Sequence, residues 1–237
     1  MNIGIIGYGI VGKATEQTFI KDHKLTIFSL DKGLFKNLLV CDLVFICIPT
    51  NTIDDIEIIK DYCKKLHMPV IIRSTVTPGF TSSLSTNIMY MPEFLRERCW
   101  QADAKTSYKV LGSNHPVDPI ILKFLQYPKI IPTGEAEMLK LMSNVYASLK
   151  ITFANHMYNY SNALGIDYDI VRKLLQDTYT NQDYLQANDN LRGFGGKCLP
   201  KDLDLLLHEM KSYGLTESLI TSIKRDNTLW PITIRKD

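Results

Sequence analysis

A single cysteine in an unusual setting is the first candidate for chemistry in this sequence. Cys198 lies in the stretch LRGFGGKCLPKD (residues 191–202), behind two glycines, between Lys197 and Lys201 and four residues before Asp202. A thiol attacks as its thiolate, and a neighbouring cation would lower the pKa of this cysteine from the free value of about 8.5. The glycines admit a bulky substrate, and backbone N–H groups can hold a developing negative charge. An inert buried thiol is the less favoured alternative, because no apolar periodicity surrounds Cys198.

A glycine-rich turn at the N-terminus is the second candidate. The apolar run at residues 2–6 leads into GYGIVG (residues 7–12) and then into an expected helix over residues 11–20. Glycines between a strand and a helix let backbone N–H groups and the positive end of the helix dipole meet a pyrophosphate. The residues expected at this contact are Gly7, Gly9, Ile10, Val11 and Gly12. A tight strand–helix connection without a ligand is the alternative.

Asp31 extends this prediction to a dinucleotide. It follows a strand-like run at residues 25–30 and lies nineteen residues after Gly12, where a carboxylate would meet the adenosine ribose hydroxyls and repel a 2′-phosphate. The expected cofactor is therefore NAD rather than NADP, with an ordinary turn or cap residue as the alternative. Pro49, Thr50 and Thr75 end two further strand-like runs and are expected along the cofactor crevice, although strand-end turns explain them nearly as well.

The alternation of strands and helices predicts the fold. Strand-like runs at residues 2–6, 25–30, 42–49 and 69–76 are joined by helical patterns at 11–20 and 53–66, and short strands follow at 108–112 and 129–134. This pattern predicts an α/β fold with a Rossmann-type, doubly wound parallel sheet that binds ligands at the carboxyl ends of its strands. Only ten residues separate Asp31 from Asp42, so the sheet is expected to be abbreviated there.

A long helix is expected to open the second half. From Glu135 to residue 164 the chain contains no Pro or Gly, and apolar residues recur every three or four positions up to Gly165. This predicts a helix of about 30 residues, about 45 Å long. Lys140 and Asn144 lie four residues apart on it, where they could present an ammonium and an amide to one substrate oxygen. A solvated helix face is the alternative.

Shorter helices are expected over residues 169–177, with Asp167 or Asp169 as the cap, and over residues 202–213 and 217–227. The predicted domains are residues 1–133, an NAD-binding Rossmann-like domain, and residues 134–237, a mainly α-helical domain that carries Cys198.

The composition fits a soluble globular protein. Of the 237 residues, 45% are hydrophobic and 22% charged, and the net charge of +2 is too small to argue for a nucleic acid or an anionic membrane as partner. The five cysteines form no C-x-x-C pair and lie near no histidine cluster, and no signal peptide or apolar run of about 20 residues is present. We therefore expect reduced thiols, a cytoplasmic location and no metal site. Cys41, Cys47 and Cys63 fit inert buried positions.

Five stretches together resemble a known family. GYGIVG, STVTPG (74–79), PEFLRE (92–97), EAEMLKLMSN (135–144) and GFGGKCLPKD (193–202) occur in the order and approximate spacing of the UDP-glucose/GDP-mannose dehydrogenase family, the nucleotide-sugar 6-dehydrogenases. The resemblance extends from Met1 to about Asn227. It implies the oxidation of a primary alcohol to an acid by two NAD, through a thiohemiacetal and then a thioester on Cys198.

The resemblance also implies roles for individual residues. Lys140 and Asn144 would stabilise the oxyanion, Asp202 would act with them on a catalytic water, and Glu93 and Thr75 would assist proton transfer. The backbone around Phe94, Leu95, Gly195 and Gly196 would face the sugar.

One departure from the family pattern concerns the substrate. Family members usually continue into a second Rossmann-like domain that binds the nucleotide, and we expect this protein to lack that C-terminal domain. It therefore resembles a minimal enzyme, a fragment, one half of a split pair with a separate nucleotide-binding chain, or a version adapted to a smaller sugar. A homodimer through the long helix is expected.

Two alternatives to the main functional prediction stay open. One is a β-hydroxyacid-type dehydrogenase, which transfers a single hydride without a cysteine. The other is a non-catalytic NAD-binding remnant. Five retained polar residues argue against a remnant, because it has no physical need for such groups in a cleft: Lys140, Asn144, Cys198, Lys201 and Asp202.

Overall fold

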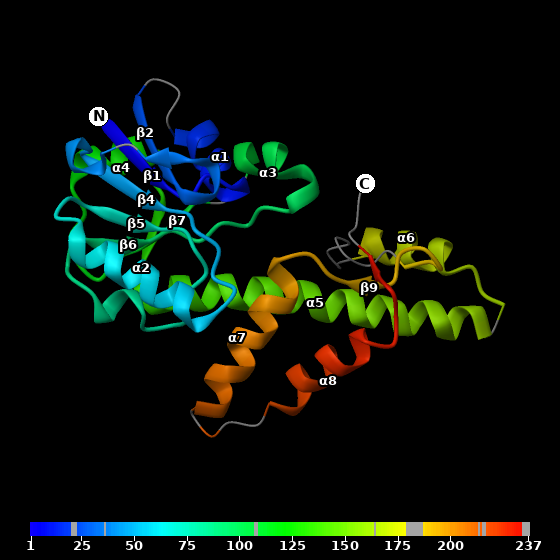
Figure 1. Ribbon diagram of the computed structural model, residues 1–237. Coiled ribbons are helices and arrows are strands. Elements are labelled where there is room, and N and C mark those ends of the chain that lie inside the picture. The colour runs from blue at the N-terminus through cyan, green and yellow to red at the C-terminus, as the bar shows by residue number, and fades with distance from the viewer. Residues whose placement is uncertain are drawn as a thin grey trace. The chain divides into compact units, whose positions relative to one another are not determined.

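The computed structural model describes residues 1–19, 23–35, 37–106, 109–163, 165–178, 187–212, 214 and 217–233. It divides the chain into two compact units, Met1–Lys140 and Leu141–Asp237. The division falls inside one long helix, α5 (Thr133–Ala163), which is coloured green to yellow-green in Figure 1. The expected ends of four elements lie outside the described residues: Ile20, Tyr108, Leu164 and Tyr213.

The first unit is built on one sheet whose described strands follow the order β3-β2-β1-β4-β5-β6-β7-β8. The strands are β1 (Asn2–Ile6), β2 (Lys24–Ser29), β3 (Leu34–Phe35), β4 (Leu43–Ile46), β5 (Val70–Ile72), β6 (Ile88–Tyr90), β7 (Val110–Gly112) and β8 (Lys129–Ile131). The strands β1 to β3 extend the sheet in one direction, and β4 to β8 extend it in the other, which is the Rossmann-type order. The predicted fold class is confirmed. The pairings β2–β3 and β6–β7 are antiparallel, a detail that the sequence did not indicate.

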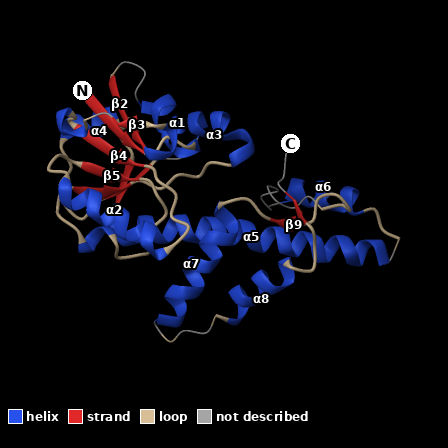
Figure 2. Ribbon diagram, in the orientation of Figure 1, coloured by secondary structure: helices blue, strands red, loops and turns tan. Residues whose placement is uncertain are grey.

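Helices cover both faces of this sheet, as Figure 2 shows. On one face α1 (Ile10–Phe19) and α4 (Pro119–Phe124) pack on side chains such as Phe45, and α3 (Trp100–Thr106) packs on α1. On the other face α2 (Ile53–Lys65) and the first turns of α5 pack on side chains such as Val44 and Ile46. Adjacent residues of β4 thus enter different cores, as period-2 alternation in a doubly covered strand requires.

The second unit is mainly helical. It comprises the rest of α5, α6 (Tyr168–Thr178), α7 (Cys198–Ser212), α8 (Ser218–Asn227) and a short parallel pair, β9 (Gly193–Phe194) with β10 (Ile232–Thr233). Its main core joins α5, β9, α7 and α8 through five buried side chains: Ile151, Phe194, Leu203, Ile220 and Ile223. The predicted cap of α6 is confirmed, since Asp167 Oδ1 accepts the N–H groups of Asp169 and Ile170.

The predicted start of α7 was wrong by four residues. The helix begins at Cys198 rather than at Asp202. Pro200 lies in its first turn, where a missing N–H costs nothing because the first helical N–H groups have no partner within the helix. The candidate nucleophile is therefore the first residue of a helix and not part of a loop.

Close packing fixes the beginning of α5 on the sheet. Asn114 Oδ1 accepts the Thr133 N–H at 3.0 Å, and Asn114 Nδ2 donates to Thr133 Oγ1 at 2.9 Å, so one side chain caps the helix. A Cβ atom added to Gly112 in β7 would lie 2.8 Å from Ala136 Cβ and 3.1 Å from Thr133 Cα. Only a glycine allows the helix to approach the strand this closely.

We therefore expect Gly112→Ala to destabilise the protein by about 1–3 kcal/mol, because helix backbone must move to make room. Gly134→Ala is the matched control, since a Cβ there meets no described atom within 4 Å, and it should be neutral or stabilise by up to about 1 kcal/mol. Urea unfolding of both variants measures this difference. Equal stabilities of the two variants would contradict the packing described here.

Candidate active site

The glycine turn after β1 has the shape needed to receive a pyrophosphate. Gly7 takes φ +86°, and a Cβ there would lie 2.7 Å from the Cys47 carbonyl oxygen. A Cβ on Gly12 would lie 2.3 Å from the Gly7 carbonyl oxygen, so α1 begins directly against the turn. A Cβ on Gly9 would meet no described atom within 4 Å. The turn is thus closed on its protein side and open at Gly9 and at the first residues of α1, Ile10 and Val11, where an anion would meet free N–H groups.

Asp31 is connected to this turn through a serine. Ser29 Oγ donates to Asp31 Oδ1 at 2.6 Å and accepts the Tyr8 N–H at 3.2 Å. The hydrogen bond from Ser29, helped by Lys32, holds the pKa of Asp31 below its ordinary value. Asp31 is exposed and ionised at neutral pH, so it can accept hydrogen bonds from hydroxyl groups such as those of a ribose.

The ends of β4 and β5 are joined by side-chain hydrogen bonds. Thr50 Oγ1 donates to the Thr75 carbonyl oxygen at 2.8 Å, and Ser74 Oγ donates to the Ile48 carbonyl oxygen at 2.7 Å. Thr50 and Thr75 are buried, and Pro49 is exposed. The structure thus brings two of the predicted crevice residues, Thr50 and Thr75, together at the carboxyl edge of the sheet.

A buried ion pair joins α5 to the segment after β6. Lys140 Nζ lies 2.7 Å from Glu93 Oε1, with only 3% and 7% of the two side chains exposed. Glu93 Oε2 also accepts the Leu95 N–H at 2.7 Å. Burial alone would raise the pKa of Glu93, but the Lys140 charge and these hydrogen bonds outweigh it and keep the pKa below its ordinary value. Glu93 is therefore ionised, and it is better suited to orient Lys140 than to donate a proton.

Arg73 is a buried cation that sequence reasoning missed. It follows β5, only 8% of it is exposed, and its Nη1 donates to Thr15 Oγ1 at 3.0 Å. Burial lowers the pKa of Arg73, while Cys47 and Glu93 act in the opposite direction. Arg73 also helps to lower the pKa of Glu93. The signal was present in the sequence as a charged residue directly after the apolar run VII (70–72).

The second unit contains a separate polar cluster between α5 and α7. Asn144 Nδ2 donates to Asp202 Oδ2, and Lys201 Nζ lies 3.0 Å from Asp202 Oδ1. Asp202 is completely buried. Lys201, which the sequence placed beside Cys198 as a possible activating cation, is thus paired with Asp202. Cys198 is exposed at the start of α7, where the helix dipole favours a thiolate.

The glycine-rich segment before Cys198 is held on one side by β10 and α8. A Cβ on Gly195 would lie 2.1 Å from Ile232 Cγ2, and Gly196 takes φ +77°. Asn227 binds both backbone groups of Phe194, accepting its N–H at 2.7 Å and donating to its carbonyl oxygen at 2.9 Å. These glycines serve close packing and a left-handed backbone conformation.

On its other side the segment is held by α5. Asn155 Oδ1 accepts from Arg192 Nε at 2.7 Å, and Asn155 Nδ2 donates to the Arg192 carbonyl oxygen at 2.6 Å. The Arg192 guanidinium also lies over the rings of Tyr158 and Trp230, 5.2 Å and 5.5 Å from their centroids. Sequence reasoning missed Asn155, Arg192 and Asn227, because their polar side chains carry no local pattern.

The predicted site residues therefore form two clusters, one in each unit, and a separate hydrogen-bonded pair, Thr50 and Thr75. The first cluster contains Glu93, Leu95 and Lys140, and the second contains Asn144, Lys201 and Asp202 in contact, with Cys198 at the start of the same helix α7. Phe94, which lies between Glu93 and Leu95 in the sequence, is half-buried. One helix, α5, carries a member of each cluster, Lys140 and Asn144, one helical turn apart.

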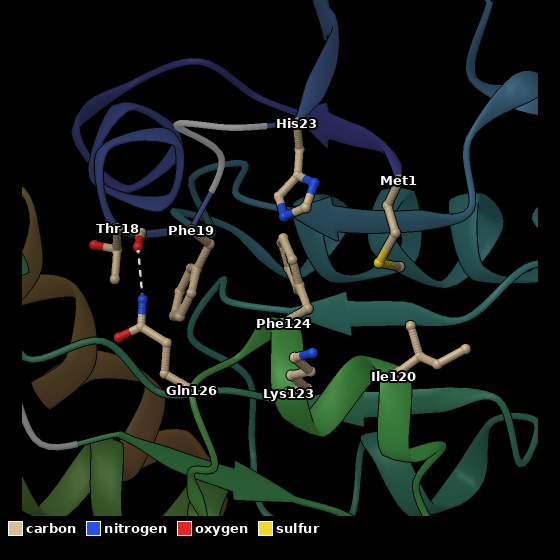
Figure 3. Close-up of a pocket in the computed structure, with 8 residues that line it drawn as sticks. All are labelled: Met1, Thr18, Phe19, His23, Ile120, Lys123, Phe124 and Gln126. Carbon is tan, nitrogen blue, oxygen red and sulfur yellow. Dashed lines mark hydrogen bonds between the residues drawn. The ribbon is translucent and has the colours of Figure 1, made fainter.

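A hollow of about 420 Å³ lies between the end of α1, α4 and the residues that precede β1 and β2 (Figure 3). It is lined by Met1, Thr18, Phe19, His23, Ile120, Lys123, Phe124 and Gln126. Met1 and His23 precede β1 and β2, so the hollow lies at the amino ends of the strands, where this fold does not bind its cofactor.

Two features are absent from the described part of the chain. No group of three or more His, Cys, Asp or Glu side chains there could hold a metal ion. No helix there is long and apolar enough to cross a membrane.

Comparison with known proteins places the chain in a family. Residues 134–228 match the central domain of the UDP-glucose/GDP-mannose dehydrogenase family. The chain is 30% identical over 186 residues to the UDP-glucose 6-dehydrogenase of Campylobacter jejuni, covering 72% of this chain and 46% of that protein. It is 28% identical over 222 residues to the GDP-mannose 6-dehydrogenase of Pseudomonas savastanoi pv. phaseolicola, covering 79% and 50%.

Solved structures show the same fold. A UDP-glucose dehydrogenase from Pyrobaculum islandicum superposes with a TM-score of 0.81 at 23% identity, covering 96% of this chain and 68% of that one. The GDP-mannose dehydrogenase of Pseudomonas aeruginosa, in a ternary complex, gives 0.64 at 21% identity, covering 97% and 69%. The fold is thus that of nucleotide-sugar dehydrogenases. The chain belongs to the UDP-glucose/GDP-mannose dehydrogenase family, and it spans about half the length of the curated relatives it matches.

The buried ion pair should make stability depend on pH in acid. The pKa of Glu93 in the folded protein lies below its ordinary value of 4.5. The pair therefore contributes stability above about pH 4.5, which is lost as the pH falls through the folded-state pKa, with a slope of up to about 1.4 kcal/mol per pH unit. Glu93→Gln/Lys140→Met replaces both charges and should flatten this slope.

Urea unfolding between about pH 6 and about pH 3.5 measures the effect. The exposed Glu97 provides the control, since Glu97→Gln removes one acidic side chain from the same segment without touching Lys140. The interpretation is wrong if the double variant loses stability in acid as steeply as the parent protein.

Proposed function

We propose that this chain carries out the NAD-dependent oxidation of the 6-hydroxymethyl group of a nucleotide sugar to a carboxylate, with Cys198 as the covalent nucleophile. The observation that carries the proposal is the setting of Cys198. It is an exposed thiol on the first residue of α7, behind a glycine-rich segment that Asn155 and Asn227 fix in place. A structural cysteine needs neither exposure nor a held backbone around it.

The glycine turn and Asp31 are the proposed cofactor site. Gly7, Gly9, Gly12, Ile10 and Val11 would hold the pyrophosphate, and Asp31 would accept hydrogen bonds from the adenosine ribose. Thr50 and Thr75 would line the crevice at the strand ends. Bound NAD would supply the hydride acceptor for both oxidations.

The covalent chemistry follows from the side chains. The Cys198 thiolate adds to the carbonyl carbon of the intermediate aldehyde, forming a C–S bond and moving an electron pair onto the oxygen. Lys140 and Asn144 would stabilise that oxyanion. Loss of hydride converts this thiohemiacetal into a thioester. Water then adds to the thioester carbon while Asp202 accepts its proton, and the C–S bond breaks to release the carboxylate and the thiolate.

The buried charges support an anionic transition state. Arg73, Glu93 and Lys140 together carry one net positive charge, and Glu93 orients Lys140 through an ion pair of 2.7 Å. A cation held in advance by the protein stabilises negative charge without reorganisation during the reaction. Phe94, Leu95, Gly195 and Gly196 would contact the sugar.

Turnover stoichiometry tests this function. With a panel of UDP- and GDP-sugars, and free sugars for comparison, the parent protein should release two NADH for each substrate consumed. Cys198→Ser should lower kcat by at least about 100-fold. It should also accumulate an acyl-enzyme ester visible by mass spectrometry, because an oxygen ester is hydrolysed more slowly than a thioester. Cys99→Ser, which changes a partly buried thiol, should keep full activity.

Other outcomes would favour other functions. One NADH per substrate, with Cys198→Ser fully active, would indicate a single-hydride dehydrogenase of the β-hydroxyacid type. Binding of NAD without turnover of any sugar would indicate a non-catalytic NAD-binding protein. Either result would overturn the proposal.

We also propose that two copies of the chain associate through α5 and α6. Large apolar side chains are exposed along one stripe of α5, at Met142, Tyr146 and Phe153, and along α6, at Ile170 and Leu174, each at 48–63%. Their spacing of four or seven residues is that of one helix face. Ile166 and Val171 are also exposed and extend this apolar face, around which a stable interface would bury about 800 Å² per protomer. The same face of a second copy would cover these side chains in a symmetric dimer.

Sedimentation velocity tests the dimer. The parent protein should sediment as a dimer, and Phe153→Glu or Ile170→Glu should shift it to a monomer, because either change places a charge in the apolar interface. Leu219→Glu is the control, since Leu219 is 60% exposed on α8, outside the proposed interface. A monomeric parent protein, or dimers in all three variants, would contradict this assembly.

A further inference from the structure

Glu137 is a buried carboxylate that the proposed chemistry does not use. It lies in α5 three residues before Lys140 and has no exposed surface. Its Oε2 accepts the Gly79 N–H at 2.7 Å, and its Oε1 accepts the Thr81 N–H at 2.8 Å. Both carboxylate oxygens are thus bonded to the backbone of a segment 56 to 58 residues away in the sequence.

That segment is the loop after β5, residues 74–83, which carries Thr75. At its beginning the Thr75 carbonyl oxygen accepts from Thr50. Farther along, the Phe80 N–H bonds to the Thr77 carbonyl oxygen at 3.1 Å, Gly79 takes φ +94°, and a 3₁₀ helix follows at Thr81–Ser83. The loop is therefore held to β4 at one end and to Glu137 at the other.

Burying this carboxylate is unfavourable by itself. Burial raises the pKa of Glu137, and the hydrogen bonds from Thr81 and Gly79 only partly oppose that effect. An apolar side chain would fill the same space without a desolvation cost, but it could not bond to two N–H groups. A buried carboxylate is justified where charge-assisted hydrogen bonds fix a backbone that would otherwise be free to move.

We propose that Glu137 is a positioning residue, which fixes the loop that carries Thr75 to the helix that carries Lys140. This inference rests on the function proposed for Thr75 and Lys140 and deepens it, because Glu137 itself touches no reacting group in that mechanism. Glu137 and Lys140 lie on adjacent turns of one rigid helix. A shift of the loop relative to Glu137 therefore changes the position of Thr75 relative to the Lys140–Glu93 pair.

Amide hydrogen exchange tests the positioning directly. In Glu137→Gln one oxygen acceptor remains, but the side-chain NH₂ group faces the second backbone N–H. We expect the Gly79 and Thr81 amides to exchange about 10- to 100-fold faster than in the parent protein, while the amides of β5 keep their protection. Glu135→Gln is the matched control, since Glu135 is exposed two residues earlier in α5, and it should leave all these rates unchanged.

The proposal is overturned if Gly79 and Thr81 exchange at the parent rate, or if β5 exchanges faster to the same degree, which would indicate a general loss of stability. Should Glu137→Gln fail to fold, Glu137→Asp keeps the charge on a shorter side chain, and the same exchange pattern is expected.

Kinetics provide the second measurement. We expect Glu137→Gln to lower kcat about 10- to 100-fold through misplacement of catalytic groups. The Kd for NAD and the exchange protection of the β5 amides should change little. An unchanged kcat would overturn the catalytic part of the inference. If the parent protein turns over no nucleotide sugar, the proposed function has failed, and the exchange rates of Gly79 and Thr81 still decide whether Glu137 holds the loop.

Discussion

The buried pair of Lys140 and Glu93 is the constraint on which the rest of the first unit depends. Removing two charges from water costs several kcal/mol for each ion, and their attraction repays this cost only with good geometry and further hydrogen bonds. The Leu95 N–H and the nearby charge of Arg73 provide these additions. The pair therefore also restricts the register of α5 on the sheet. If α5 slipped by one turn along the sheet, both charges would be buried without partners, so only one register of the helix is allowed.

Other contacts at the start of α5 agree with that register. Asn114 caps the helix at Thr133, Gly112 leaves room for Ala136, and Glu137 bonds to the loop after β5. Each of these contacts involves a backbone group or a closely packed side chain. The helix is consequently a rigid reference for the polar groups it carries. Precise placement of a cation such as Lys140 is what distinguishes a catalytic group from a solvated one.

The sequence predicted those features that are encoded locally. Apolar alternation and glycine placement located β1, α1, β4 and α2 to within a few residues, and the absence of Pro and Gly located α5. The family resemblance predicted roles for Lys140, Asn144, Cys198 and Asp202, and these roles stay predictions. What it did not reveal depends on partners that are distant in the chain. Arg73 meets Thr15, Glu137 meets Gly79, and Asn227 meets Phe194 across 33 to 58 residues. The start of α7 was missed because Gly-Gly-Lys before Cys198 and Pro200 after it resemble a loop.

The glycines around Cys198 show why local composition can mislead about function. They suggested backbone freedom, yet Gly195 packs against Ile232, and Phe194 is bonded at both backbone groups by Asn227. Arg192 is bound to Asn155 through its side chain and its carbonyl oxygen. The segment is therefore held from α5 on one side and from α8 and β10 on the other. Backbone N–H groups fixed in this way can stabilise charge beside the thiol without paying for reorganisation during the reaction. Gly195 is needed for the close approach to Ile232, and Gly196 for a left-handed backbone conformation.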